Sequence, residues 1–356
     1  MKINAIDLFC GVGGLTHGLQ KAGINVVAGI DIEAKCKYPY EHNNNAKFIA
    51  TDLKKVSADF INSLYPQDTD IKILVGCAPC QPFSSYSYRY KGSDNSKNKM
   101  DLLRYFGKLV KAIKPDIVSM ENVPQLTKEP IFNEFIDLLN KEKYHVNWEI
   151  VYAPNYGVPQ KRKRLVLLAS KNTDIKLIPP TNNKSNYPTV RKTIGKLEPI
   201  EAGESSNKDS MHRAVKLNEL NLKRIRQSKP GGTWNDWDKE LLPKAYTRKS
   251  GQSYTSVYGR MNWDEPSPTI TTKFYGFGNG RFGHPEQDRA ISYREGAMLQ
   301  TFPRNYKFFD NKHPISFHDL GIMIGNAVPV KLGTAIGKSI LKEINNEKST
   351  KIIKWR

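Results

Sequence analysis

The chain has 356 residues, of which 38% are hydrophobic and 25% charged, and this length and composition predict a globular protein with room for two domains. Lysine and arginine outnumber aspartate and glutamate by 55 to 35, a formal net charge of +20, which favours nucleic acid over a membrane surface as the partner. We expect no apolar stretch long enough to span a bilayer, and Asp7 comes too early for a secretory signal, so we expect a soluble intracellular protein.

The first elements alternate between strand and helix. Residues 3–9 form an apolar run that predicts a buried strand, and residues 25–30 predict a second one. Between them, Leu15 and Leu19 lie on one face of a helix, and Gly23 is placed to end it. Strands that alternate with helices predict a parallel, doubly wound sheet.

Three glycines, Gly11, Gly13 and Gly14, connect the first strand to the first helix. Their spacing differs from the dinucleotide fingerprint, so a plain tight turn remains an alternative to a cofactor loop. Two acids follow, Asp31 after the second strand and Asp52 further on. Asp31 could accept hydrogen bonds from ribose hydroxyls and Asp52 one from an adenine amino group, although either acid alone is more typical of a solvated acid or a helix cap. As a set they indicate a nucleoside-containing cofactor.

Cys80 follows the apolar run 71–75 and stands between Pro79 and Gln81. Rigid proline turns hold the thiol at the carboxyl edge of the sheet, where open α/β folds bind ligands, so Cys80 is a candidate nucleophile. Its spacing from Cys77 also matches a redox dithiol or half a zinc site. We disfavour both, because no second pair of ligands is present and no helix pattern begins at the motif, and we expect no metal.

An apolar stripe over residues 102–113 predicts a helix that packs on the core. The next strand, 117–120, leads directly into Glu121 at the same edge as Cys80. A carboxylate does not lower the pKa of a nearby thiol, so Glu121 is better suited to act on the substrate as an acid or hydrogen-bond partner. A helix N-cap is the alternative.

A basic run, residues 160–164, precedes the apolar strand 165–169. Arg162 and Arg164 alternate along it and would point to one side, where they could contact a phosphate; a solvated charged face is the alternative. From about residue 178 the chain is rich in Lys, Asn, Ser and Pro, with a more regular part from about residue 266, and residues 338–356 predict a terminal helix.

Six segments, in this order, resemble the motifs of the DNA (cytosine-5) methyltransferases of bacterial restriction-modification systems. They are residues 7–14, 79–81, 121–123, 160–164, 294–303 and 325–329. The resemblance implies an α/β, Rossmann-like, S-adenosylmethionine-dependent methyltransferase sheet, mixed but mostly parallel, with a smaller loop-rich target-recognition domain. It assigns residues 1–180 plus 315–356 to the catalytic and cofactor-binding domain and 181–314 to the target-recognition domain and hinge.

The resemblance also implies a function. A monomer would transfer a methyl group from S-adenosylmethionine to carbon 5 of a cytosine flipped out of double-stranded DNA, leaving S-adenosylhomocysteine. It would act in the bacterial cytoplasm and protect a short recognition site from a cognate restriction endonuclease. Two alternatives stay open, a tRNA cytosine-5 methyltransferase and a non-catalytic DNA-binding protein on the same scaffold.

The roles of single residues follow from the motif matches. Cys80 would add to carbon 6 of the cytosine, Glu121 would bind ring nitrogen N3 and the exocyclic amine, and Arg162 and Arg164 would contact the flipped nucleotide. Asn122 and Gln81 would support the catalytic loop. Ile32 stands where the family often has an aromatic residue that stacks on adenine. The full expected cofactor set is Phe9, Gly11, Gly13, Gly14, Asp31, Ile32, Asp52, Leu53, Pro79, Leu102, Asn326 and Ala327.

Overall fold

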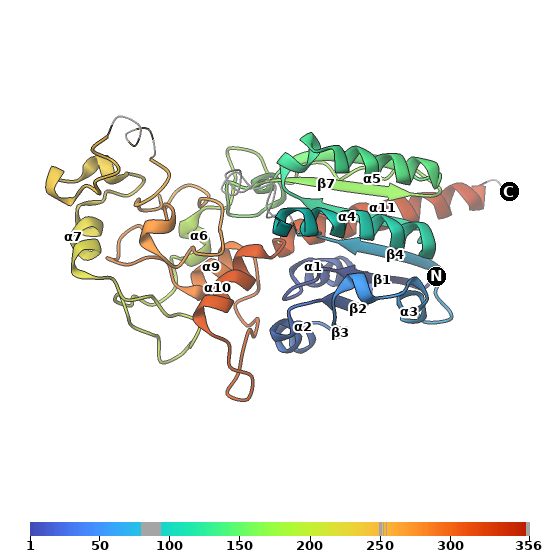
Figure 1. The fold of residues 1–356 in the computed structure, drawn as a ribbon, viewed down its shortest axis with the longest axis horizontal. Helices are drawn as coiled ribbons and strands as arrows, with labels where there is room; N and C mark the ends of the chain where they lie inside the picture. Colours follow the sequence, from blue (N-terminus) through green and yellow to red (C-terminus); the bar gives the residue numbers. More distant parts are fainter. Residues whose placement is uncertain (80–93, 249–250, 252, 254, 354–356) are drawn as a thin grey trace.

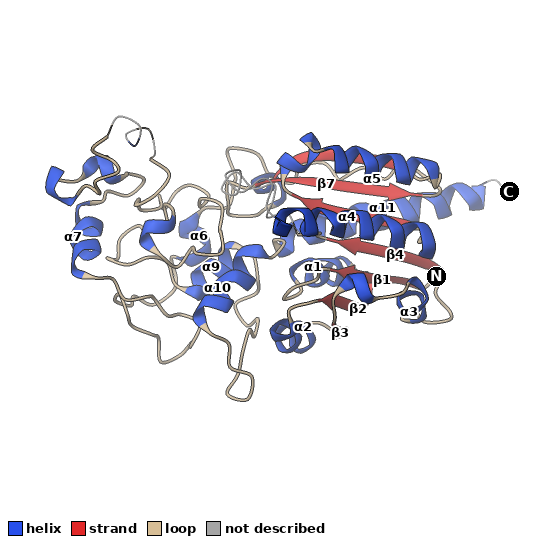
Figure 2. Ribbon diagram, viewed as in Figure 1, coloured by secondary structure: helices blue, strands red, loops and turns tan. Residues whose placement is uncertain are grey.

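The computed structural model describes residues 1–79, 94–248, 251, 253 and 255–353. Two lobes lie side by side along the long axis of the molecule (Figure 1). One lobe holds a sheet with helices on both faces, and the other consists mainly of loops with short helices (Figure 2). Both chain termini belong to the sheet lobe.

A seven-stranded sheet organises the larger lobe in the order β3-β2-β1-β4-β5-β7-β6. Strand β7 runs antiparallel to both of its neighbours, and the other strand pairs are parallel. The mixed, mostly parallel sheet expected from the sequence is therefore confirmed. The strands are β1 (Ile3–Leu8), β2 (Asn25–Asp31), β3 (Lys47–Ala50), β4 (Ile71–Gly76), β5 (Ile117–Asn122), β6 (His145–Tyr152) and β7 (Lys163–Ser170).

Helices cover both faces of this sheet because successive strand side chains point to opposite sides. In β1, Ile6 packs in the cluster with α3 (Ala58–Ser63), α4 (Asp94–Ile113) and α5 (Pro130–Lys141). Ala5 instead packs in the cluster with α1 (Gly14–Ala22) and α11 (Val330–Ile353). The sheet thus becomes the middle of three layers, and α11 brings the end of the chain back onto the first strand.

Helices α1 and α11 pack unusually closely. A Cβ atom added to Gly18 would lie 2.5 Å from the carbonyl oxygen of Val330 and 2.7 Å from Cα of Gly333. Glycine is therefore required for this backbone contact. As predicted, α1 ends at Gly23, which has the left-handed φ of 105° and donates its N–H to the carbonyls of Gln20 and Leu19.

The smaller lobe contains α6 (Val190–Ile194), α7 (Glu219–Gln227) and α9 (Tyr293–Leu299), with α10 (Phe317–Asn326) packed on α9. After Pro266, regular structure before α10 is limited to the turn η9 (Phe277–Asn279) and α9. Helix α2 (Lys37–Asn43) also belongs to the sheet lobe. The other single-turn helices in the described part of the chain are η1 (Ala34–Cys36), η2 (Leu53–Lys55), η5 (Pro124–Lys128), η6 (Ala153–Tyr156), η7 (Trp234–Asp236) and η8 (Lys239–Leu241).

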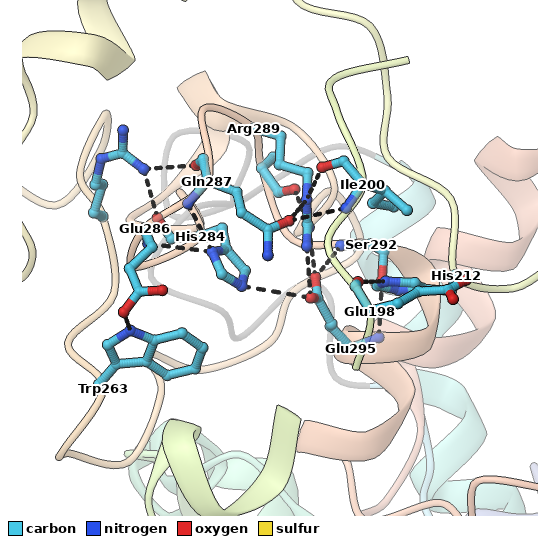
Figure 3. Close-up of polar contacts among 12 residues, drawn as sticks. Glu198, Ile200, His212, Trp263, His284, Glu286, Gln287, Arg289, Ser292 and Glu295 are labelled. Atoms are coloured by element: carbon cyan, nitrogen blue, oxygen red, sulfur yellow. Dashed lines mark hydrogen bonds and ion pairs between the residues drawn. The ribbon is translucent and has the colours of Figure 1, made fainter. Parts of the chain in front are cut away.

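A buried charged cluster holds the start of α9 in place (Figure 3). Arg289 donates to both carboxylate oxygens of Glu295, at 2.7 and 2.8 Å, and Ser292 and Glu295 cap the helix reciprocally. The Nδ1 atom of His284 accepts from the backbone N–H groups of Glu286 and Gln287. The smaller lobe has few helices and strands to fix its conformation. A charge-assisted network of buried hydrogen bonds can stabilise that conformation instead.

One expectation about apolar segments is wrong. Within the described residues, the stretch Phe317–Asn346 is long and apolar enough to cross a bilayer by length and composition. Most of it is buried inside the protein, as Leu320, Ile324, Leu332 and Ile336 show. Leu320 and Ile324 of α10 pack in one hydrophobic cluster, and Leu332 and Ile336 of α11 pack in another.

Candidate functional site

The site is built at the carboxyl edge of the sheet. Strand register aligns Leu8 with Gly76 and Gly76 with Met120, so the segments that follow β1, β4 and β5 leave the sheet together. Open α/β sheets bind ligands at this edge. The predicted nucleophile Cys80 and its neighbour Gln81 lie outside the described residues, and the description of the segment after β4 ends at Pro79, which is half-buried.

Glu121, at the end of β5, is held between two side chains. It is 2% exposed, and the thiol of Cys77 donates to its Oε2 atom at 3.0 Å. The Nε atom of Arg164 lies 3.0 Å from Oε1 as an ion partner, without the direction of a hydrogen bond. The site therefore presents a buried carboxylate whose charge is compensated by one arginine.

Sequence reasoning missed the role of Cys77, which it considered only as part of a Cys-x-x-Cys pair. The contact depends on the register of the parallel pair β4 and β5, which aligns Gly76 with Met120 and which the sequence pattern does not reveal. The next residues along each strand, Cys77 and Glu121, are then neighbours.

The two arginines predicted to contact the substrate, Arg162 and Arg164, lie in different surroundings. Arg164 has a side chain that is 13% exposed and lies beside Glu121. Arg162 is buried instead, and its Nη1 atom lies 3.3 Å from both Oε1 of Gln160 and the carbonyl oxygen of Ile270. The structure thus brings Arg164 to the carboxylate, whereas Arg162 contacts the junction between the lobes.

Asn122 links the ends of β4 and β5. Its Nδ2 atom donates to the carbonyl oxygen of Ala78 at 3.1 Å, and its Oδ1 atom accepts from the N–H of Val123 at 2.9 Å. The buried amide thereby fixes the segment two residues before Cys80 relative to Glu121.

The glycine loop has an unusual backbone. Phe9, Gly11 and Gly13 have φ values of 60°, 50° and 85°, a region that glycine adopts freely and phenylalanine rarely does. The N–H of Gly11 donates to Oδ2 of Asp31 at 2.8 Å. A Cβ atom on Gly11 would meet nothing within 4 Å, so this backbone faces open space.

Asp31, at the end of β2, lies directly beside this loop. Burial raises the pKa of its carboxyl, and the N–H donors of Glu33 and Gly11 partly oppose that rise. The next residue, Ile32, is 71% exposed. An anchored carboxylate, an exposed aliphatic side chain and an open glycine backbone therefore lie together where a nucleoside was expected.

The remaining expected cofactor residues are spread around this edge. Asp52 is half-buried and accepts from the N–H of Lys54, whereas the side chain of Leu53 is buried in the core. Leu102, near the start of the described side chains of α4, is half-buried. Asn326 is exposed at the end of α10 and Ala327 follows it, half-buried.

The returning segment touches the glycine loop. A Cβ atom on Gly14 would lie 2.3 Å from the carbonyl oxygen of Val328, which places residues 326–328 against the start of α1. Tyr306 also reaches the loop and donates to the carbonyl oxygen of Val12 at 2.5 Å. Segments nearly 300 residues apart in sequence thus meet at one site.

A buried polar group beneath the loop was not foreseen. Thr16 donates to Oδ2 of Asp7 at 2.7 Å and lies 3.0 Å from the hydroxyl of Tyr40. Burial raises the pKa of Asp7 to about 7, with a further increase from Asp31. Since Asp7 points inward from β1, the strand pattern alone could not reveal these partners.

Comparisons with known proteins agree with this geometry. The profile of the C-5 cytosine-specific DNA methylase family matches residues 3–342. The chain is 52% identical to the type II methylase M.HgiDII of Herpetosiphon aurantiacus, over 94% of both chains. It is 30% identical to the type II methyltransferase M1.HphI of Haemophilus parahaemolyticus, over 98% of this chain and 89% of that one.

Solved structures share the fold. The Entamoeba histolytica methyltransferase EhMeth superposes with a TM-score of 0.66 at 15% identity, over 97% of this chain and 99% of that one. The Dnmt2 methyltransferase of S. pombe gives a TM-score of 0.61 at 16% identity, over 97% of this chain and all of that one. The sheet and both lobes therefore have counterparts of known structure.

Proposed function

The chain belongs to the C-5 cytosine-specific DNA methylase family, and from this membership we propose how its own residues carry out the methylation. The reaction is the transfer of a methyl group from S-adenosylmethionine to carbon 5 of cytosine in DNA. The observation that supports the residue roles most directly is the buried Glu121, held by Cys77 and Arg164 at the edge of the sheet where β4 and β5 end.

The glycine loop fits the adenosyl part of the cofactor. Gly11 combines a left-handed backbone with open space where a side chain would be, which allows a ligand to approach the main chain closely. Asp31 would accept from the ribose hydroxyls, and Ile32 would cover one face of the adenine. When bound, the cofactor supplies an electrophilic methyl group on its sulfonium. Phe9, Gly13, Gly14, Asp52, Leu53, Pro79, Leu102, Asn326 and Ala327 complete the proposed set.

The target side is assigned to Cys80, Glu121 and Arg164. The thiolate of Cys80 adds to carbon 6 of the flipped cytosine, which makes carbon 5 nucleophilic. Once carbon 5 carries the methyl group, it loses its proton and the Cys80 thiolate leaves carbon 6, which restores the aromatic ring. Glu121 accepts from the exocyclic amine and carries the proton that N3 takes up as the ring gains electrons. Arg164 balances the charge of Glu121 at 3.0 Å. Asn122, with Gln81, holds the Cys80 segment. Arg162, which contacts Gln160 and Ile270, supports the segment that carries Arg164.

Double-stranded DNA with a specific short sequence is the proposed substrate. The net charge of +20 supports a polyanion through counterion release, and the relative M.HgiDII is named a type II methylase. We extend the proposal to a monomer in the bacterial cytoplasm, with residues 181–314 as target-recognition domain and hinge, and with a cognate restriction endonuclease whose site it protects.

The test supplies tritiated S-adenosylmethionine with unmethylated duplex DNA or with total tRNA, followed by digestion and identification of the labelled base. We expect label in 5-methylcytosine from DNA, none with Cys80→Ala, and retained label with the matched control Cys36→Ala, since Cys36 is buried among apolar side chains such as Tyr40 and Phe48 and is not assigned to the cytosine. Label only in tRNA would overturn the substrate. Label that persists in Cys80→Ala would overturn the assigned nucleophile, and no label at all would favour a non-catalytic binding protein.

A further inference from the structure

Two buried glutamines meet where the lobes join. Gln160 precedes β7 and Gln300 follows α9, and both are 0% exposed. The Nε2 atom of Gln160 donates to Oε1 of Gln300 at 3.0 Å and to the carbonyl oxygen of Leu299 at 3.3 Å. Each polar atom of a buried amide pair needs a hydrogen-bond partner. The partners of each amide therefore show which segments the pair connects.

Gln160 contacts the target side of the site. Its Oε1 atom accepts from the N–H of Ile270 at 2.9 Å and from Nη1 of Arg162 at 3.3 Å. Arg162 is two residues from Arg164, which pairs with Glu121. A main-chain hydrogen bond also connects these two segments: the N–H of Lys161 donates to the carbonyl oxygen of Ser267 at 2.7 Å.

Gln300 contacts the cofactor side. Its Nε2 atom donates to the carbonyl oxygens of Ile324 at 2.7 Å and Ala327 at 3.3 Å, with that of Gly325 at 3.4 Å. These carbonyls lie at the end of α10, directly before Val328, whose own carbonyl abuts Gly14. The N–H of Val330 in turn donates to the carbonyl of Gln300 at 3.2 Å.

The orientation of both amides follows from their partners. A flipped Gln160 would set its NH₂ against the N–H of Ile270 and the guanidinium of Arg162, donor against donor. A flipped Gln300 would set its oxygen against three carbonyl oxygens. The hydrogen bonds therefore run in one direction, from Arg162 through Gln160 and Gln300 to the end of α10.

We propose that Gln160 and Gln300 are a positioning pair that couples the cofactor site to the target site. The pair connects the segment carrying Arg162 and Arg164 to the segment carrying Asn326 and Ala327, which come from distant parts of the chain. Occupancy of the glycine-loop site, where the carbonyl oxygen of Val328 abuts Gly14, then favours the placement of the arginines that the target cytosine requires. This inference rests on the proposed residue roles.

The experiment measures the affinity for a duplex DNA substrate with and without S-adenosylhomocysteine, by equilibrium titration, and takes the ratio of the two Kd values. Methyl transfer by the unaltered protein is measured separately, so that failure of the proposed function is recognised independently. We expect the unaltered protein to bind DNA at least about fivefold more tightly with S-adenosylhomocysteine. In Gln300→Met and Gln160→Met, which keep the side-chain volume, that ratio should fall to within about twofold of one.

A control separates positioning from simple loss of stability. Gln287→Met removes the acceptor for Arg289 Nε and the N–H of Ile200 inside the smaller lobe, and should lower Tm while leaving the ratio unchanged. Gln160→Glu keeps the acceptor for Ile270 and Arg162 and loses the donor to Oε1 of Gln300 and to the carbonyl oxygen of Leu299. It therefore tests the link if a methionine variant does not fold. A ratio unchanged in Gln160→Glu and Gln300→Met, or a ratio near one in the unaltered protein, overturns the coupling.

Discussion

Glu121 is a buried carboxylate that two neighbouring side chains stabilise. An isolated carboxylate at this depth would be strongly disfavoured, but Arg164 lies 3.0 Å from one oxygen and Cys77 donates to the other. The two partners come from β7 and from the end of β4, so the geometry of three neighbouring strands fixes the position of one side chain.

Replacing Arg164 tests this arrangement. Arg164→Met leaves Glu121 buried without its cation, so we expect kcat for methyl transfer to fall by about 100-fold or more and stability to fall by about 3 kcal/mol. Arg164→Lys restores a charge and should recover part of kcat. Arg104→Met is the matched control, since Arg104 pairs with the exposed Glu134 and its loss should leave kcat unchanged; equal losses in both variants would contradict the assignment.

Asp7 should make the stability of the folded protein depend on pH. Its pKa is about 7 in the folded protein and near 3.8 in the unfolded chain, so the folded state binds the extra proton between these values. Its contribution to stability is complete below pH 3.8 and is lost as pH rises toward 7, by up to about 4 kcal/mol.

We therefore expect Asp7→Asn, which keeps an acceptor for Thr16, to reduce the fall in stability between pH 5 and pH 8. Urea unfolding at several pH values measures this difference. Asp59→Asn alters an exposed carboxyl and should leave the pH dependence of the unaltered protein intact. Parallel pH curves for the unaltered protein and Asp7→Asn would show that Asp7 is ionised throughout.

At the scale of elements, α9 depends on a buried charged cluster more than on its own length. Glu295 caps the helix and binds Arg289, and these contacts hold the pKa of Glu295 at about 2 despite its burial. Nearby, burial lowers the pKa of His284 to about 4, although Glu295 acts in the opposite direction. Its Nδ1 accepts two N–H groups, which only the neutral ring can do.

His284 should make the smaller lobe sensitive to acid. Between pH 6.5 and pH 4 the unfolded state binds the proton and the folded state does not, so stability falls as pH falls, by up to about 3 kcal/mol. We expect His284→Asn, which retains an acceptor, to weaken this dependence. Hydrogen exchange of α9 amides at pH 5 and pH 7 would measure it, with exposed His145→Asn as control; an unchanged ratio of exchange rates in His284→Asn would contradict the role.

Some strands of the sheet could be predicted from the sequence, and others could not. Apolar runs bounded by glycine or acids predicted β1, β2, β4 and β5, because parallel strands are buried on both faces. The edge strands β3 and β6 were not predicted, since β3 has four residues and β6 exposes Trp148 and Ile150. At the site, strand ends predicted where Glu121 and Asp31 lie. The partners Cys77, Thr16 and Gln300 depend on register and tertiary contacts, which local pattern does not encode.

At the scale of the whole molecule, the sheet lobe is assembled from two parts of the chain that are far apart in sequence. Helix α11 packs on α1 through Gly18 and Gly333, and the segment before it reaches the glycine loop. The smaller lobe is thus inserted between two parts of the larger one, and Gln160 and Gln300 lie at the crossing.

Gly18→Ala tests this assembly. The added Cβ would lie 2.5 Å from a backbone oxygen that cannot rotate away, so α11 must shift, at a cost of about 1–3 kcal/mol. Gly107→Ala is the matched control: it also lies in a helix, but its Cβ would meet only side chains, at 3.2 Å or more. Thermal unfolding should show a lower Tm for Gly18→Ala alone, and an equal Tm in both variants would argue against the tight contact.

The discontinuous sheet lobe also sets an order of events during synthesis. While the ribosome is still translating the smaller lobe, α1 and one face of β1 have no α11 to cover them, so their apolar side chains remain exposed on the nascent chain. Domains generally fold as units during translation, and transiently exposed apolar surface promotes aggregation. The sheet lobe therefore depends on the emergence of α11, and a messenger truncated before α11 would yield a product in which this apolar face stays uncovered.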